Sequence, residues 1–477
     1  MDKGKKISRR SFLKRMGLGT AATVLAVSGC DNANPLPETA TDGNGIPSGK
    51  MTCRTTVNTG DKVSILGYGA MRLPTVSNQS GRESEDTIDQ DEVNRHVDYA
   101  IAHGVNYFDT SPAYCKGRSE HALGIALSRH ARSEFFVATK LSNFAPATWS
   151  RENGIKMYRN SLKELQTNYI DYMLLHAIGQ PATDLAGRQL DGMQAFEERY
   201  IKNGILDFLL QERKAGRIRN LGFSYHGDVK VFDHLLSQND RYHWDFVQIQ
   251  MNYVDWHHAK EINERNTNAD YLYGELASRS IPVVIMEPLL GGQLANLPDF
   301  LVAKLKQRRP DDSVASWAFR FAGTHERVLT VLSGMTYMEH LQENIKTYSP
   351  LQPCSAEELE LLEEAAKIFL QYPTVPCTGC QYCMPCPYGL NIPEIFAHYN
   401  KCVNEGYVSA SSQDENYRRN RKIFLVGYDR KVPAERQANH CIGCGKCMSH
   451  CPQGIDIPSN MQKIDAYVEK LKQETEF

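Results

Sequence analysis

Eight cysteines in the last quarter of the chain fall into two runs that have the spacing of metal ligands. The first run reads C-x2-C-x2-C-x2-C-P and the second reads C-x2-C-x2-C-x3-C-P. The segments that follow them, PYGLNIPEIF and PQGIDIPSNM, also match each other, so one ligand-binding unit is present twice. The two runs consist of Cys377, Cys380, Cys383 and Cys386, and of Cys441, Cys444, Cys447 and Cys451.

This spacing predicts two four-iron–four-sulfur clusters. Three closely spaced thiolates can bind three irons of a cubane, and the fourth cysteine, turned away before proline, reaches the other cluster. Two zinc sites are the alternative, since paired C-x2-C motifs also bind zinc, and disulfides are a third possibility. The third cysteine and the cysteine–proline ending favour clusters. We expect one cluster on Cys377, Cys380, Cys383 and Cys451, and the second on Cys441, Cys444, Cys447 and Cys386.

Four other residues have the side chains that a carbonyl reduction needs. The developing alkoxide requires a proton donor, and Tyr114 can serve if its pKa, ordinarily about 10, is lowered. The ammonium of Lys140 would lower that pKa, and the carboxylate of Asp109 would keep a buried ammonium charged. The neutral imidazole of His176 can hold the carbonyl oxygen in line. Each residue alone also has a structural explanation, but together they indicate one catalytic site.

The elements that must position these residues are predicted to be parallel strands. Short apolar runs alternate with helical stretches between Met51 and Ser349, and eight such strands are typical of a (β/α)8 TIM barrel. An open doubly wound sheet is the alternative, but no glycine-rich dinucleotide loop follows the first strand. The predicted strands are Ser64–Gly67, Val105–Phe108, Phe135–Thr139, Tyr169–Leu175, Ile218–Phe223, Phe246–Ile249, Val283–Met286 and Val328–Leu332.

In such barrels the chemistry lies at the carboxyl ends of the strands. Asp109, Lys140 and His176 follow the second, third and fourth predicted strands. Further polar residues fall at the ends of the fifth, sixth and eighth strands, and they are Ser224, Gln248 and Ser333. Polar groups at so many strand ends predict one site at one mouth of the barrel.

The motifs GVNYFDTSPAYCKGRSEHALG, FVATK, YIDYMLLH and IRNLGFS resemble those of the aldo/keto reductases, over roughly residues 63–345. The resemblance implies that Tyr114 is the acid/base, Lys140 tunes it, Asp109 pairs with Lys140, and His176 orients the substrate. It also implies a nicotinamide dinucleotide held without a Rossmann domain. The carboxamide contacts would be Ser224 and Gln248, and the adenosine end would lie on Ser333, Gly334, Glu343 and Asn344.

The cofactor site departs from the family pattern in three places. Tyr225 stands where many members have Asn, and Met286 stands where many have a ring-stacking aromatic residue. Residues 333–344 contain no Lys or Arg, whereas a 2′-phosphate needs cationic partners. We therefore expect NAD(H) rather than NADP(H).

The tail resembles the mainly helical kind of two-cluster ferredoxin. A helix is expected over Ser355–Phe369, where Ser-x-x-Glu forms a capping box. The predicted division of the chain is a signal peptide over 1–30, a flexible linker over 31–50, the barrel over 51–350 and the cluster domain over 351–477.

The N-terminus carries an export signal in this interpretation. The segment SRRSFLK, with Arg9 and Arg10, resembles a twin-arginine signal, and the apolar stretch Met16–Gly29 is too short to span a membrane. It ends before Cys30 in a sequence that resembles a lipoprotein cleavage box. An amphiphilic cytoplasmic leader is the alternative. We expect a bacterial protein that is periplasmic or anchored to a membrane through a lipid on Cys30.

Charge is nearly balanced, with 54 Lys and Arg against 56 Asp and Glu, so nothing indicates nucleic acid as a partner. The expected function is the interconversion of a small carbonyl compound and its alcohol by hydride transfer. The clusters would exchange electrons with an unidentified redox partner. One alternative is an electron-transfer or docking module without catalysis, and another is an enzyme with purely structural clusters.

Overall fold

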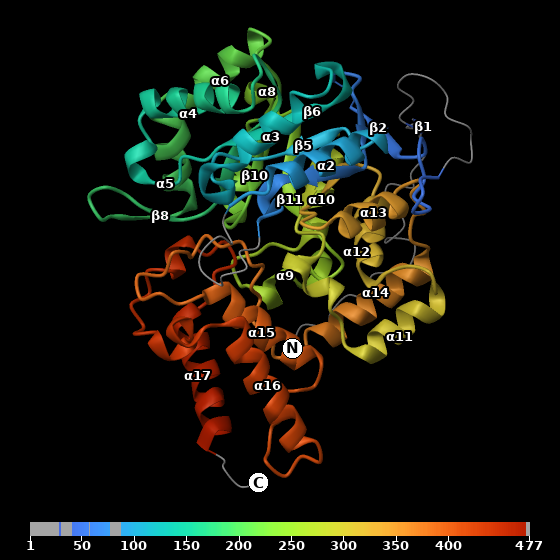
Figure 1. The fold of residues 1–477 in the computed structure, drawn as a ribbon. Helices are drawn as coiled ribbons and strands as arrows, with labels where there is room; N and C mark the ends of the chain where they lie inside the picture. The colour runs from blue at the N-terminus through green and yellow to red at the C-terminus, as the bar shows by residue number, and fades with distance from the viewer. Residues whose placement is uncertain (1–27, 30–40, 57, 77–86, 474–477) are drawn as a thin grey trace, which may run out of the picture.

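Eight parallel strands close into a barrel in the computed structural model (Figure 1). The structure describes residues 28–29, 41–56, 58–76 and 87–473. Strand β13 pairs with β4 and so completes the ring. The strands are β4 (Leu66–Gly69), β5 (Tyr107–Asp109), β6 (Phe136–Leu141), β7 (Ile170–Ile178), β10 (Ile218–Tyr225), β11 (Phe246–Gln250), β12 (Val283–Met286) and β13 (Val328–Ser333). The predicted barrel is confirmed.

Helices cover the outside of the barrel because each has one apolar face. In the first of them, Val93, Val97 and Ala100 are buried at helical spacing, and Asp89 caps the start by accepting from Glu92 N at 3.0 Å. The helices are α2 (Gln90–Ala102), α3 (Ser119–Leu127), α4 (Arg151–Glu164), α5 (Gly192–Phe196), α6 (Ile205–Lys214), α7 (Val229–Ser237), α8 (Asn239–Tyr242), α9 (Asp255–Ile262), α10 (Ala269–Ser278), α11 (Asp299–Arg308), α12 (Val314–Thr324) and α13 (Met338–Thr347).

An antiparallel hairpin closes the end of the barrel where the strands begin. Its strands β2 (Thr52–Thr55) and β3 (Lys62–Ser64) directly precede β4, and β1 (Ser28–Gly29) pairs with β2. Val63 packs inside the barrel with Tyr107, Tyr172 and Phe246. A second small hairpin, β8 (Ala182–Thr183) and β9 (Gln189–Leu190), projects beyond the opposite end of β7. In the described chain the mouth at the carboxyl ends of the strands is therefore the open end of the barrel.

The C-terminal part is mainly helical. From Val375 onward it has an apolar core of its own, whereas Leu362, Ala365 and Phe369 pack in the barrel core. Helix α14 (Ala356–Phe369) starts at the predicted capping box, in which Ser355 and Glu358 bond reciprocally. Arg309 binds both carboxylate oxygens of Glu358, at 2.7 and 2.9 Å, and so attaches α14 to the barrel. The helices α15 (Ile392–Asn404), α16 (Tyr417–Lys431) and α17 (Ile457–Gln473) follow, orange to red in Figure 1.

The two loops that carry the cysteine runs lie between these helices and the mouth of the barrel. A Cβ on Gly291, in the loop after β12, would overlap Thr378 of the first run, so the two backbones are in direct contact. Gln293 Nε2 donates to Cys377 O at 3.3 Å, and Asn263 donates to Gln453 O next to the second run. We call residues 375–455 the cluster module.

The segments on which the export prediction depends, residues 1–27 and Cys30, lie outside the described residues. Within the described chain, no helix combines the length and the apolar character that crossing a membrane requires.

Candidate active site

A buried ion pair lies at the centre of the barrel mouth. Lys140 on β6 donates to both carboxylate oxygens of Asp109, the last residue of β5, at 2.6 and 2.7 Å, and to Thr110 O at 2.9 Å. The two side chains are about 1% and 3% exposed. Burial lowers the pKa of Lys140 and raises the pKa of Asp109, and each charge partly offsets that effect for the other. The pair therefore depends on both partners being present.

Tyr114 lies above this pair, at the start of a short 3-10 turn, Tyr114–Gly117. Lys140 Nζ is 4.8 Å from the centre of the tyrosine ring, a cation–π distance. The pKa of Tyr114 is well above 10, because burial is the largest effect and the charge of Asp109 adds to it. This differs from the expected lowering by lysine. The ammonium is directed at Asp109 and Thr110, so the phenol keeps its proton in this state.

His176, near the end of β7, completes the group. Its Nδ1 is 2.6 Å from Ser142 Oγ, which leaves Nε2 for a ligand in the cavity. Burial, then the charge of Lys140, holds the pKa of His176 well below its usual value. The imidazole is therefore neutral at ordinary pH, as a group that orients a carbonyl oxygen by a hydrogen bond must be. Its ring meets that of Tyr114 edge-on, with centroids 6.0 Å apart.

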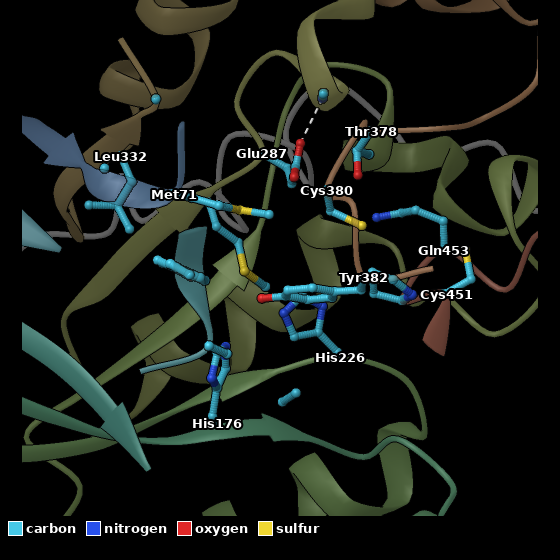
Figure 2. Close-up of a pocket in the computed structure, with 18 of the residues that line it drawn as sticks. Met71, His176, His226, Glu287, Leu332, Thr378, Cys380, Tyr382, Cys451 and Gln453 are labelled. Carbon is cyan, nitrogen blue, oxygen red and sulfur yellow. Dashed lines mark hydrogen bonds between the residues drawn. The ribbon is translucent and has the colours of Figure 1, made fainter. Parts of the chain in front are cut away.

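A cavity of about 1030 Å³ extends from these residues to the outer end of β13. Asp109, Tyr114 and His176 line it on the barrel side. Figure 2 shows that Cys380, Tyr382, Cys451 and other residues of the cluster module form part of the same wall. Asp109, Tyr114 and His176 thus share a single cavity with one end of the cluster module.

Five of the six residues predicted to bind the dinucleotide line this cavity. Gln248 is 2% exposed, and its Oε1 has no hydrogen-bond partner in the described chain, so it can accept from a carboxamide. At the other end, Asn344 Nδ2 donates to Ser333 Oγ at 3.0 Å. The five are Gln248, Ser333, Gly334, Glu343 and Asn344.

Ser224 is the exception among the predicted dinucleotide residues. It is fully buried, and its Oγ accepts from Ala177 N at 2.9 Å, across to β7. The pairing of β10 with β7 shifts register between Phe223 and Tyr225, and this irregularity directs the hydroxyl between the strands. Ser224 does not belong to the lining of the cavity. The cavity otherwise fits a nicotinamide dinucleotide.

The structure brings the eight cysteines into two sets of four. Burial is the main reason that the pKa of Cys377 rises to about 12, and the neighbouring thiols of Cys380 and Cys451 raise it further. Cys451 also raises the pKa of Cys380 and Cys383. The fourth cysteine of the second run therefore lies with the first three of the first run.

The other set combines the fourth cysteine of the first run with the first three cysteines of the second run. The pKa of Cys447 rises to about 11, first through burial and then through the thiols of Cys386, Cys441 and Cys444. All eight cysteines are free thiols. Among the described residues, no three His, Cys, Asp or Glu side chains lie close enough to bind one metal ion, whereas tetrahedral zinc needs sulfurs about 3.8 Å apart. Four cysteines in each set match the number of ligands of a four-iron cluster, in which each thiolate binds a different iron.

The sequence interpretation missed the residues that the cluster module adds to the cavity, above all Tyr382. One signal was present in the internal repeat. Tyr382 stands between the second and third cysteines of the first run, and Lys446 occupies the same place in the second run. Lys446 is exposed, whereas Tyr382 is partly buried against the barrel. A difference of this kind between two copies of one unit indicates different surroundings.

Comparison with known proteins agrees with this architecture. Residues 65–367 match the aldo/keto reductase family, and residues 376–455 match the 4Fe-4S dicluster domain. L-galactose dehydrogenase of Arabidopsis thaliana is 25% identical over 335 residues, which cover 66% of this chain and 94% of that protein. An uncharacterized oxidoreductase of Bacillus subtilis is 25% identical over 64% of this chain and 93% of its own length. The holo form of an aldo-keto reductase from Bacillus halodurans has the same fold, with a TM-score of 0.50 at 21% identity, over 66% of this chain and 96% of that chain.

Proposed function

We propose that this chain, which belongs to the aldo/keto reductase family and is an oxidoreductase, interconverts a carbonyl compound and its alcohol in the cavity shared by the barrel and the cluster module. The observation that carries the proposal is the buried Lys140–Asp109 pair beneath Tyr114, with neutral His176 beside it. These are the groups that move a proton to and from an oxygen atom while a hydride is transferred. A bound nicotinamide dinucleotide supplies or accepts that hydride.

In the direction of reduction, Tyr114 is the acid. Its raised pKa keeps the phenol protonated until negative charge develops on the carbonyl oxygen. Lys140, 4.8 Å from the ring, then stabilises the tyrosinate that remains, and Asp109 keeps the ammonium charged. His176 donates from Nε2 to the same oxygen and fixes its position. In the direction of oxidation, tyrosinate accepts the proton of the alcohol.

NAD(H) is the proposed dinucleotide. Residues 333–344, at the outer end of the cavity, contain no Lys or Arg. Arg72 passes beside Gly334, but its guanidinium donates to Thr378 O and faces the cluster module. Residues 333–344 themselves thus offer no Lys or Arg to a 2′-phosphate. Calorimetry should give NAD(H) an affinity at least equal to that of NADP(H), and a salt-sensitive preference for NADP(H) would contradict this.

The cluster module is proposed to exchange electrons with a redox partner. The two sets of free cysteines support this. The inner set, which is Cys377, Cys380, Cys383 and Cys451, borders the cavity through Cys380 and Cys451. In the outer set, which is Cys386, Cys441, Cys444 and Cys447, Cys444 is exposed. Bound clusters carry single electrons. We also propose export by the twin-arginine route, which the Arg9-Arg10 motif supports. Replacing both arginines with lysine should retain the protein in the cytoplasm.

The variant Tyr114→Phe tests the central proposal. It removes the proton donor and should slow single-turnover hydride transfer at least about 10²-fold, with dinucleotide affinity nearly unchanged. Tyr107→Phe is the matched control, because the Tyr107 hydroxyl is buried inside the barrel, away from the cavity, and has no hydrogen-bond partner among the described residues. Wild-type rates in Tyr114→Phe would remove this residue from the mechanism.

A further inference from the structure

The outer wall of the catalytic cavity is built by the cluster module. Thr378 and Tyr382 come from the first cysteine run, and Gln453 follows the second run. In Figure 2 the ring of Tyr382 extends across the cavity above His226, toward the side on which His176 lies. The ligand space thus has catalytic groups of the barrel on one side and these three side chains on the other.

Tyr382 reaches the catalytic group through ring contacts. Its centroid is 6.2 Å from that of Phe144, and Phe144 is 4.8 Å from His176. No hydrogen bond of the Tyr382 hydroxyl occurs within the described chain, so this group is available to a ligand. A molecule that lies between Tyr114 and this wall must touch the Tyr382 ring.

The wall is fixed in place. The guanidinium of Arg72 donates to Thr378 O, and Gly291 packs directly on the Thr378 backbone. The side chain of Gln453 is held by Gln250, whose Oε1 lies 3.4 Å from Gln453 Nε2. Arg72 and Gly291 lie in the loops after β4 and β12, and Gln250 is the last residue of β11, so three parts of the barrel mouth set the position of the module.

Some polar atoms of this wall have no hydrogen-bond partner in the described chain. Thr378 and Gln453 are 2% and 4% exposed, yet Thr378 Oγ1 and Gln453 Oε1 have no partner in the described chain. Glu287 lies beside them on the cavity and accepts from Gly291 N at 2.6 Å with one oxygen. Buried polar atoms in folded proteins nearly always have partners, so unpartnered ones beside a ligand space indicate ligand groups.

We infer that Thr378, Tyr382 and Gln453 contact the substrate, and that the substrate is a polyhydroxylated carbonyl compound or its alcohol, such as a sugar or polyol. Hydroxyl groups donate to Gln453 Oε1 and Glu287, and they can donate to or accept from Thr378 and Tyr382. An alkyl chain in the same place would leave these groups unpaired, which a site built to bind hydroxyls penalises. The inference rests on the proposed function, since it names the substrate class of the same site.

Calorimetry on the cluster-loaded protein with NADH tests the inference without turnover. The probes are three hexitols (galactitol, glucitol and mannitol) and hexan-1-ol, which has the same number of carbons and a single hydroxyl. At least one hexitol should bind, and Thr378→Val and Tyr382→Phe should each weaken it about three- to tenfold, the effect of one hydrogen bond. The affinity of hexan-1-ol should not change. Tyr388→Phe, in the same module but 44% exposed and away from the cavity, is the control.

A second readout does not depend on affinity. Because Thr378 and Tyr382 adjoin ligands of the inner cysteine set, the hexitol should alter the EPR spectrum of the reduced protein, and hexan-1-ol should alter it less. Iron content and thermal unfolding of the variants show that the wall is intact. The inference is overturned if no hexitol binds, or if both variants bind it as the wild type does. If carbonyl reduction persists in either of these cases, the proposed function stands although the substrate class is wrong. Full activity of Tyr114→Phe would instead contradict the proposed function, whatever the hexitol measurements give.

Discussion

Lys140→Met should destabilise the barrel strongly, because it leaves the Asp109 carboxylate buried without its cation. The ammonium makes three contacts of 2.6 to 2.9 Å, and methionine retains most of the volume. Removing one partner of a buried ion pair typically costs about 3–5 kcal/mol. We expect a loss of that size in the free energy of unfolding at pH 7.

The loss should depend on pH with a defined sign. Burial already raises the pKa of Asp109 in the folded protein, and without Lys140 that pKa must rise further. Such a carboxyl group has a higher pKa in the folded than in the unfolded protein. Its contribution to stability is fully present below the unfolded pKa of about 3.9, and it is lost progressively as the pH rises toward the folded pKa. The penalty in Lys140→Met should therefore be larger at pH 7 than at pH 5, by up to about 1.4 kcal/mol for each pH unit.

Urea unfolding followed by tryptophan fluorescence measures this, since all four tryptophans lie in the barrel sequence: Trp149, Trp244, Trp256 and Trp317. Asp109→Asn/Lys140→Met, which removes both charges, should be at least about 2 kcal/mol more stable than Lys140→Met. Lys163→Met, on the exposed side of α4, should stay within about 0.5 kcal/mol of wild type. A cost below about 1 kcal/mol in Lys140→Met at both pH values would refute the reasoning.

Three further predictions concern the module and the outer barrel. Cys451→Ser should reduce iron from about eight per chain and remove one of two EPR signals of the reduced protein, because it takes a ligand from the inner set. Gly291→Ala should cost more than about 2 kcal/mol and expose the module to proteolysis, whereas Gly292→Ala, with nothing near its Cβ position, should cost about 1 kcal/mol for its positive φ alone. Burial, and then the charge of Arg54, lower the pKa of His325 to about 3. The contribution of the neutral imidazole to stability is therefore fully present above pH 6.5 and declines as the pH falls. Wild type should lose about 2 kcal/mol of unfolding free energy from this residue between pH 6.5 and 5, and His325→Phe should abolish that loss.

Each of these has a contrary outcome. Zinc in place of iron, or two intact signals in Cys451→Ser, would contradict the crossed cysteine sets. Equal effects of the two glycine variants would show that the contact with Thr378 does not hold the module. An acid sensitivity that is unchanged in His325→Phe would assign it to other groups.

The strands were predictable because each is a short apolar run, and a parallel strand buried on both faces has that composition. The first was misplaced by two residues. Ser64 belongs to the hairpin strand β3, and β4 begins at Leu66. A Cβ on Gly67 would come within 2.7 Å of Leu332 Cδ2, so this strand needs glycine where hydrophobic periodicity expects a large side chain.

The convergence of Asp109, Lys140 and His176 could be predicted from the sequence because each lies at or near a strand end, and the barrel determines where strand ends meet. The raised pKa of Tyr114 could not. It depends on the direction of the Lys140 ammonium, which one carboxylate and one backbone carbonyl determine. Similarly, the sequence cannot show which face of the cluster module meets the barrel, because that depends on contacts such as Asn263 with Gln453, 190 residues apart.

The boundary between the two apolar cores lies between Phe369 and Val375, and it is one of folding but not of function. The module has its own apolar core, and the barrel has another. Yet Cys380 and Cys451 border the cavity that holds Tyr114, and Tyr382 forms its outer wall. A barrel cut after Phe369 would keep its own core and the Lys140–Asp109 pair, since every contact of that pair lies within the barrel. It would lose Cys380, Tyr382 and Cys451 from the cavity wall, so both parts of the chain form one cavity.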